Sequence, residues 1–224
     1  MKTRSINIFL SIFLLISFQN ISAQILAVPE IEQEQNQWCW SGVSKCILDY
    51  YFSANNWPAG SNQNQCGIAE YARSQNSAYF GGTNCCAFPT GSCNNPNWMY
   101  GVNGSIEDIL SFFGAITTNN LTTSISESQW QNEINNNTPF IIRYGWNNGG
   151  GHFVVGHGYS GNSYYTMDPW FGEGYTISTF NWVQNAGFNG SWTHTQTLSP
   201  APSYLGCTDP IAYNYDPNAQ IDDG

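Results

Sequence analysis

Cys39 lies between two tryptophans in the stretch Gln33-Glu34-Gln35-Asn36-Gln37-Trp38-Cys39-Trp40. Apolar side chains recur after it with the spacing of one helical face, which predicts a helix over residues 40–52 with the cysteine at its N-terminus. These side chains are Val43, Ile47, Leu48 and Tyr51. Exposed N–H groups and the positive end of the helix dipole favour an anion there, and the thiolate is the nucleophilic form of cysteine. The stretch therefore predicts a reactive thiol at the start of a helix.

A histidine and a carboxylate follow far downstream, in the segments 150–152 (Gly-Gly-His) and 167–170 (Met-Asp-Pro-Trp). A cysteine nucleophile needs a base that takes its proton and a group that orients the base, and these residues are commonly far apart in sequence. We therefore expect Cys39 to be the nucleophile, His152 the base and Asp168 the residue that orients the imidazole. The pattern predicts a chain that breaks acyl bonds.

Other polar residues near these motifs have different interpretations. Gln33 carries a neutral amide six residues before Cys39, and an amide can stabilise an oxyanion without adding another titrating group. His157 is five residues beyond the first histidine, so on a regular strand it points to the opposite face and is expected to be packed. His194 has no partner motif and is expected to be structural.

The order of the predicted elements indicates an α+β fold. After Pro139, short β-branched or aromatic runs separated by Gly and Asn turns predict strands. The helical half carries the cysteine, the antiparallel β half carries the histidine, and a cleft is expected between the two. Helices are predicted over residues 66–72, from the capping signal at 105–108 to a stop at Gly114, and from the start marked by Ser126 and Gln129 to Asn135; strands are predicted over 140–144, 152–159, 163–167, 175–178 and 192–197.

The N-terminus and the charge point to export. Residues 1–23 have two basic residues, then an apolar run, then a small residue at the cut, which is typical of a secretory signal peptide. Its removal changes the formal charge from −10 to 3 − 15 = −12 and leaves only Lys45, Arg73 and Arg143. So few cations argue against binding to nucleic acid or to anionic lipid. We expect a secreted bacterial protein, extracellular or periplasmic, that acts as a monomer on a protein or peptide substrate without a cofactor or metal.

Cysteine usage agrees with an oxidising compartment. Cys66, Cys85, Cys86 and Cys93 belong to a loop rich in Gly, Pro and Asn, which cannot build its own core, and we expect them to form disulfides with one another. The alternative of a zinc site is disfavoured because there are no paired CxxC units and no nearby histidine. The states of the other two cysteines, Cys46 and Cys207, are left open.

Three segments complete the domain organisation. Residues 24–198 form the predicted catalytic domain, 199–205 a Pro-rich linker, and 206–224 a partial acidic segment with one cysteine. The aspartates of the last segment offer oxygen ligands to Ca²⁺, and a metal-free acidic segment is the alternative. They are Asp209, Asp216, Asp222 and Asp223.

Between Val28 and Asn181 the sequence resembles the papain-like cysteine peptidases, within them the bacterial C39-like and AvrRpt2-type groups. The motifs that carry the resemblance are those around Cys39, the 66–94 cysteine loop, the 151–156 strand and the 165–170 segment. It implies a papain-like fold and the same roles for the cysteine, the histidine, Asp168 and Gln33. Residues 206–224 resemble GCTDP…DDG segments at the C-termini of exported Bacteroidetes proteins.

The side chains around the motifs also predict where a substrate binds. Trp38, Trp40 and Trp170 are candidate walls of the cleft, with aromatic packing as the alternative, and Gly151 would let a substrate backbone approach the imidazole. The leading hypothesis is a cysteine peptidase. Its rivals are another Cys-dependent acyl transfer, by a deamidase or a transglutaminase, and a catalytically idle binding domain of the same fold.

Overall fold

The computed structural model describes residues 23–54, 56–60, 62–199, 207 and 209–213. The predicted signal peptide up to residue 22, residues 200–205 of the linker and most of the 206–224 segment, including three of its four aspartates, lie outside this part. Within it, no helix is long and apolar enough to span a bilayer. The elements are β1 (Ala23–Ile25), α1 (Cys39–Phe52), α2 (Gln65–Gln75), α3 (Ser77–Phe80), α4 (Ile106–Gly114), β2 (Thr117–Leu121), α5 (Glu127–Asn135), β3 (Phe140–Trp146), β4 (Gly151–Ser160), β5 (Ser163–Asp168), β6 (Gly174–Ser178), α6 (Phe180–Gln184), the 3₁₀ turn η1 (Ala186–Phe188) and β7 (Gly190–Ser199).

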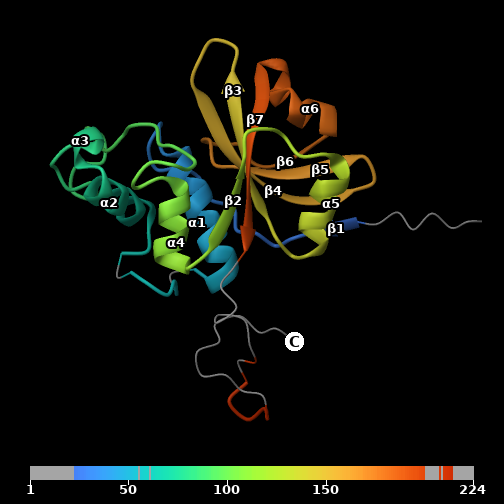
Figure 1. Cartoon of the computed structure of the whole chain (residues 1–224), viewed down its shortest axis with the longest axis horizontal. Coiled ribbons are helices and arrows are strands. Elements are labelled where there is room, and N and C mark those ends of the chain that lie inside the picture. Colours follow the sequence, from blue (N-terminus) through green and yellow to red (C-terminus); the bar gives the residue numbers. More distant parts are fainter. Residues whose placement is uncertain (1–22, 55, 61, 200–206, 208, 214–224) are drawn as a thin grey trace, which may run out of the picture.

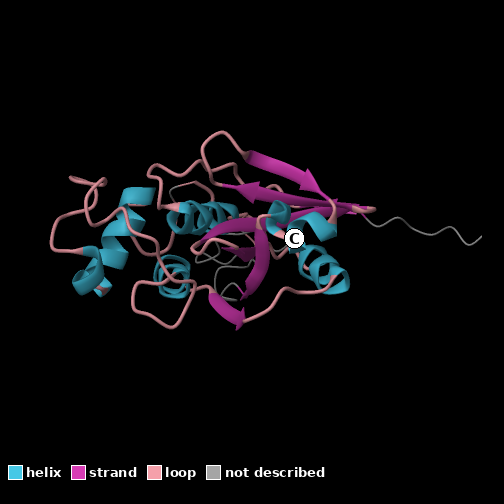
Figure 2. Cartoon of the chain, turned by 90° about the horizontal axis from the view of Figure 1, so that it is seen from above, coloured by secondary structure: helices cyan, strands magenta, loops and turns pink. Residues whose placement is uncertain are grey.

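The predicted α+β architecture is confirmed. In the described part of the chain, seven strands form one antiparallel sheet in the order β2-β7-β3-β4-β5-β6, with β1 pairing with β4 outside this path. Helices α1 to α4 gather on one side of the molecule and the strands on the other (Figure 1), and the view from above shows the same division (Figure 2). A helical half and a β half therefore face each other across one junction.

Helix α1 lies at that junction, because it packs against α2 and α4 on one side and against β4 on the other. Its apolar face is fully buried, with Val43, Ile47 and Leu48 all at zero exposure. The 3.6-residue spacing that predicted the helix is therefore the spacing of its core contacts. This burial fixes the first residue of the helix, Cys39, at the junction between the helical half and the sheet.

Two register shifts interrupt the sheet. One lies between Gly156 and Gly158 in the pairing of β4 with β5, and the other between Arg143 and Tyr144 in the pairing of β3 with β7. Each leaves an extra residue on one strand, which is the arrangement of a β-bulge. His157 occupies the first bulge, so the regular alternation assumed for it in the sequence ends there.

Two helix boundaries differ in detail from the prediction. Ser105 is the N-cap residue of α4, but its hydroxyl caps no backbone N–H; instead Asp108 accepts a hydrogen bond from Gly104 N at 2.8 Å. Helix α4 ends at Gly114 as expected, yet the left-handed residue is Ala115, with φ of 49°. By contrast, α5 begins with the predicted capping box between Ser126 and Gln129.

Candidate active site

The candidate nucleophile is the first residue of α1. No side chain caps the N-terminus of this helix, and no acidic residue stands in its first turn. The backbone N–H groups there and the positive end of the helix dipole are therefore available to an anion. The thiol of Cys39 is half-buried and unpaired.

The β half supplies the other two residues of the predicted triad. His152 is the second residue of β4 and Asp168 is the last residue of β5. The Nε2 of His152 lies 2.6 Å from Oδ1 of Asp168, and the same oxygen accepts a hydrogen bond from the backbone N–H of Trp170 at 2.8 Å. His152 also forms a side-chain hydrogen bond with Cys39, and because Nε2 faces the carboxylate, Nδ1 is the ring nitrogen left for the thiol.

This arrangement keeps the imidazole protonated. Burial by itself would lower the pKa of His152, but the hydrogen bonds with Asp168 and Cys39 and the charges of both groups outweigh it and raise the pKa to about 10. The side chains of the pair are only 9% and 20% exposed, so water screens them little. An imidazolium next to a thiol stabilises the thiolate, which is the attacking form.

All three residues line one cavity of about 630 Å³. Its walls include Trp146, Trp170 and Trp182, while Asp168 and Glu173 supply carboxylates and no Lys or Arg is found among the described lining residues. The ring of Trp146 stacks on that of His152, with centroids 6.3 Å apart and planes inclined by 16°. A cleft with aromatic walls, and with no Lys or Arg among its described lining residues, therefore surrounds the thiol and the imidazole.

Gln33 lies close to the candidate active site, but its side-chain amide does not line the cavity. The side chain is buried, with an exposed fraction of 1%, and its Nε2 donates to the carbonyl of Gln35 at 2.8 Å. Its backbone N–H donates to the carbonyl of Pro169 at 2.7 Å, which ties it to the segment that carries Asp168. Gln33 is not among the residues that line the cavity.

The four predicted substrate-contact residues divide into two pairs. Gly151 and Trp170 line the cavity, whereas Trp38 and Trp40 have no exposed surface and do not. The indole N–H of Trp38 donates to the carbonyl of Cys93 at 2.8 Å, and that of Trp40 to the carbonyl of Asn95 at 3.0 Å. These two tryptophans belong to the core, because a buried indole needs an acceptor and the 93–95 segment provides it.

Sequence reasoning missed the role of Gly42, one turn after the nucleophile. A Cβ there would lie 2.8 Å from Cβ of Pro169 and 3.8 Å from Cβ of Gln33. The bare backbone of α1 thus lets the 168–169 segment cross the first turn of the helix, which brings Asp168 toward His152. The only sequence signal was a glycine in a helix interior, where glycine is normally unfavourable.

The other two histidines lie outside the cavity. His157 is 3% exposed, and its Nδ1 is 3.0 Å from the carbonyl of Leu26, in the segment after β1. Burial lowers the pKa of His157, although the hydrogen bond with that carbonyl opposes the shift. His194 is half-buried on β7, and its Nδ1 is 2.9 Å from the hydroxyl of Thr193.

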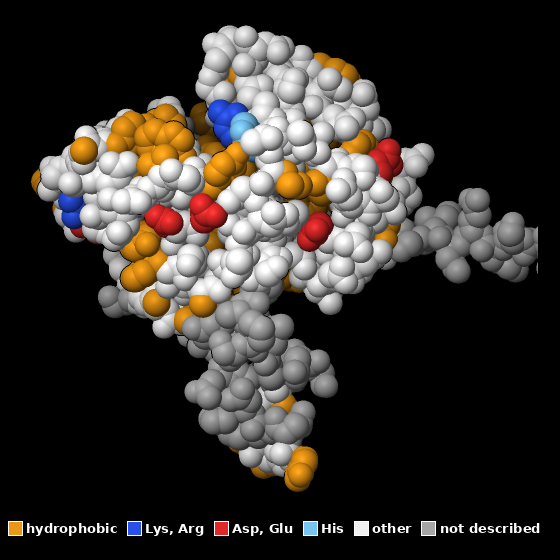
Figure 3. Space-filling model, viewed as in Figure 1, with side chains coloured by type: hydrophobic (Ala, Val, Ile, Leu, Met, Phe, Trp, Pro, Cys, Tyr) orange, Lys and Arg blue, Asp and Glu red, His pale blue; other side chains and the backbone are white. Residues whose placement is uncertain are grey.

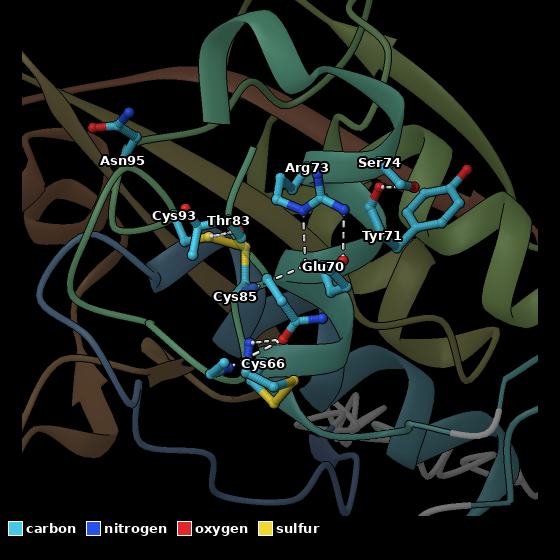
Figure 4. Close-up of a disulfide and its surroundings, with 12 residues drawn as sticks. Cys66, Glu70, Tyr71, Arg73, Ser74, Thr83, Cys85, Cys93 and Asn95 are labelled. Carbon is cyan, nitrogen blue, oxygen red and sulfur yellow. Dashed lines mark hydrogen bonds and ion pairs between the residues drawn. A yellow bond between two sulfur atoms is a disulfide. The ribbon is translucent and has the colours of Figure 1, made fainter. Parts of the chain in front are cut away.

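Two disulfides join the four cysteines predicted to pair. Cys66 of α2 is bonded to Cys86, and Cys85 is bonded to Cys93. Figure 4 shows Glu70 beside this loop, where its carboxylate accepts from the backbone N–H of Cys85 at 2.8 Å and pairs with Arg73. Cys46 and Cys207 are unpaired; Cys46 is buried, and burial raises the pKa of its thiol, helped by the charge of Asp49.

Comparisons with known proteins bear on the fold and on the family of the chain. A crystal structure of a C39-like peptidase from Bacillus anthracis is 17% identical, covers 80% of this chain and 99% of its own, and superposes with a TM-score of 0.50, which supports the fold. The peptidase domain of Streptococcus ComA, a bifunctional ABC transporter, is 16% identical over 76% of this chain and 97% of its own, with a TM-score of 0.46. No curated protein gives a significant match. The model of the Peptidase_C39 like family matches residues 25–200, and the chain therefore belongs to this family.

Proposed function

We propose that this protein is a secreted cysteine peptidase that hydrolyses peptide bonds, with Cys39 as nucleophile, His152 as base and Asp168 as the residue that orients the imidazole. One observation carries the proposal: the three side chains meet at a single cavity, with the imidazole held by the carboxylate at 2.6 Å on one nitrogen and bonded to the thiol. Membership of a peptidase family supports it.

The first half of the reaction would acylate the thiol. The reaction would start from the thiolate–imidazolium pair, in which His152 already carries the proton. The thiolate attacks the carbonyl carbon of the scissile bond, so that the carbonyl oxygen becomes an oxyanion. As the oxyanion collapses, the C–N bond breaks and His152 returns its proton to the leaving amine. A thioester on Cys39 and a free amine are the products of this half.

The second half would release the acid. A water molecule gives a proton to His152 while its oxygen attacks the thioester carbon, and the C–S bond then breaks. The free carboxylic acid leaves and the thiolate–imidazolium pair is restored. Asp168 holds the imidazolium and fixes its orientation throughout.

Two sets of donors are proposed for the oxyanion. The backbone N–H groups at the start of α1 lie near the thiol, because Cys39 is the first residue of that helix. Gln33 is the side-chain candidate, because a primary amide has two N–H donors and only one is engaged by Gln35. Gln33→Glu tests it: a carboxylate at that position would lower kcat by about 10²–10³-fold if the amide faces the oxyanion.

The same residues would serve a deamidase or a transglutaminase, in which the thioester forms from a side-chain amide. What favours peptide hydrolysis is the family to which the chain belongs. Release of ammonia without new N-termini, from glutamine-containing peptides, would favour the alternative.

The test combines labelling with cleavage of a peptide library. We expect iodoacetamide to modify Cys39 of the folded protein first and to leave the buried Cys46 unmodified, because burial raises the pKa of that thiol. Cys39→Ala should abolish new N-termini in the library, and Cys207→Ala is the matched control because it also removes an unpaired cysteine.

Cleavage by the Cys39→Ala variant would refute the proposed nucleophile. Absence of any cleavage by the wild-type protein would favour the idle binding domain. Export is tested separately by N-terminal sequencing of the protein from the medium or periplasm, where a chain beginning at Gln24 is expected and an intact residue 1 would contradict the signal peptide.

A further inference from the structure

A second cavity of about 480 Å³ lies next to the active-site cleft. Its walls carry the rings of Tyr79, Trp98 and Tyr100 together with Arg143 and His194, and no Asp or Glu lines it among the described residues. Pro96 lines both cavities, so the two cavities adjoin at this residue. In a chain with a strong excess of acidic residues, a cationic cavity with aromatic walls calls for an explanation.

Arg143 differs from the other two cations of the mature chain. Lys45 is paired with Asp49 at 2.8 Å, and Arg73 is paired with Glu70 at 2.6 Å. Within the described residues, Arg143 makes no ion pair; one nitrogen, Nη1, donates to the hydroxyl of Thr193 at 2.9 Å. A guanidinium has five N–H donors, so most of those of Arg143 remain for a ligand.

The β-bulge in the pairing of β3 with β7 holds this guanidinium in place. Arg143 pairs with His194 and the next residue of β3 pairs with Trp192, so Thr193 is the extra residue. The hydroxyl of Thr193 bonds both Nη1 and the carbonyl of Arg143, at 2.9 and 3.1 Å, and lies 2.9 Å from Nδ1 of His194. Bulges often re-aim side chains next to functional sites, and here one hydroxyl orients both cavity residues.

The guanidinium also reaches the cleft. A Cβ on Gly151 would lie 3.1 Å from Nη2 of Arg143, and Gly151 lines the cleft immediately before His152. In the space-filling view a blue side chain adjoins a pale blue one where the helical and β halves meet, with hydrophobic side chains around them (Figure 3). The guanidinium of Arg143 is therefore close to the residue that directly precedes the candidate base, His152.

We propose that this cavity binds a carboxylate of the peptide substrate, a few residues from the scissile bond, through Arg143. The planar fork of an arginine matches a carboxylate, and the aromatic rings would cover the apolar part of the residue that carries it. Burial and the charge of Arg143 lower the pKa of His194, so the arginine supplies the positive charge. An extended peptide advances by about 3.3 Å per residue, so a few residues suffice to pass Pro96 from one cavity to the next.

This inference rests on the proposed peptidase function, and the test separates the two. Peptides with one cleavage site are made in pairs that differ only by Glu or Gln at each flanking position in turn, and in pairs with a C-terminal acid or amide. We expect wild-type kcat/KM to favour Glu at one position by about tenfold, as a charge-assisted hydrogen bond allows. If the C-terminal carboxylate is the group that binds, the acid and amide pair shows the preference instead.

The variants decide the assignment. Arg143→Gln should bring the Glu to Gln ratio to about one, Arg143→Lys should keep part of the preference, and Arg73→Gln, which removes an ion-paired arginine elsewhere, should keep all of it. A preference that survives Arg143→Gln, or no carboxylate preference at all in the wild type, would overturn the inference. If the wild type cleaves no peptide, the proposed function fails. The carboxylate site is then tested by fluorescence anisotropy, as the ratio of the affinities of the Cys39→Ala variant for the Glu and Gln members of each peptide pair.

Discussion

Replacing Asp168 by Asn should move the alkaline limit of activity to lower pH. The asparagine keeps an oxygen that can accept from Nε2 of His152 and removes the negative charge 2.6 Å from that nitrogen. A neighbouring opposite charge is worth about 1–3 pKa units, so the pKa of His152 should fall from about 10 to between about 7 and 9. Because one unit corresponds to about 1.4 kcal/mol, the imidazolium loses about 1.4–4 kcal/mol of stabilisation.

The alkaline limit should move to lower pH because the proposed mechanism needs the protonated form of His152. His152 has its pKa raised in the folded protein, so the imidazolium is present at neutral pH and is lost as pH rises through that pKa. In the variant this loss comes earlier. At pH 9, a pKa lowered by 1–3 units reduces the protonated fraction, and with it kcat/KM, by about twofold to about hundredfold.

The assay is kcat/KM against pH from 5 to 11 on a fluorogenic peptide. Glu173→Gln is the matched control, because it removes another carboxylate that lines the same cavity without a hydrogen bond to His152 among the described contacts, and its alkaline limit should shift by less than about half a unit. An alkaline limit that stays in place or moves upward in Asp168→Asn would refute the assignment of Asp168 as partner of the imidazole.

Three further outcomes are expected. Gly42→Ala gains about 1 kcal/mol of helix propensity but places a methyl group 2.8 Å from Cβ of Pro169, and overpacking costs about 1–3 kcal/mol, so the free energy of unfolding should fall by about 0–2 kcal/mol. Displacement of the 168–169 segment should lower kcat/KM by about 10- to 100-fold, and unchanged kinetics would contradict the close approach. The double replacement of Cys66 and Cys86 by Ser opens a loop with a sequence separation of 20 and should lower the free energy of unfolding by about 3 kcal/mol in denaturant titrations, while an unchanged midpoint would argue against the bond. His157→Ala removes a buried hydrogen bond and should destabilise the fold by about 1–3 kcal/mol without slowing alkylation of the nucleophile, and slower alkylation would place that histidine in the site.

Much of the fold was predictable because its signals are local. The apolar spacing over residues 40–52, the capping box at Ser126 and the aromatic runs after Pro139 each act within a few residues, and each element formed where it was expected. The bulge at His157 was not predictable, since it depends on how the partner strand pairs. The short strand β1 was also missed, because three residues carry no periodicity of their own.

The candidate site likewise combines residues that the sequence predicted with residues that only the fold brings close. Residue type and order were enough to predict that Cys39, His152 and Asp168 lie together, and all three line one cavity, while their catalytic roles stay a prediction. The positions of Trp38 and Trp40 beside Cys39 in the sequence could not show that both side chains pack in the core. A motif at the start of a helix does not distinguish residues that face a cavity from residues that face the interior. The walls formed by Trp146 and Trp182 come from strand ends and a short helix brought close only by the fold.

The anchoring of the two tryptophans that flank the candidate nucleophile has a practical consequence for handling the protein. Their indoles donate to carbonyls of the 93–95 segment, and Cys93 is one end of a disulfide, so one thiol reagent can act both on the candidate nucleophile and on the segment that supports it. A low concentration of dithiothreitol should keep Cys39 reduced and raise activity, whereas a higher concentration should reduce the Cys85–Cys93 bond, loosen the support of the start of α1 and lower activity. Activity should therefore pass through a maximum as reductant is added, and a preparation stored in strong reductant would look inactive although the thiol of Cys39 is intact.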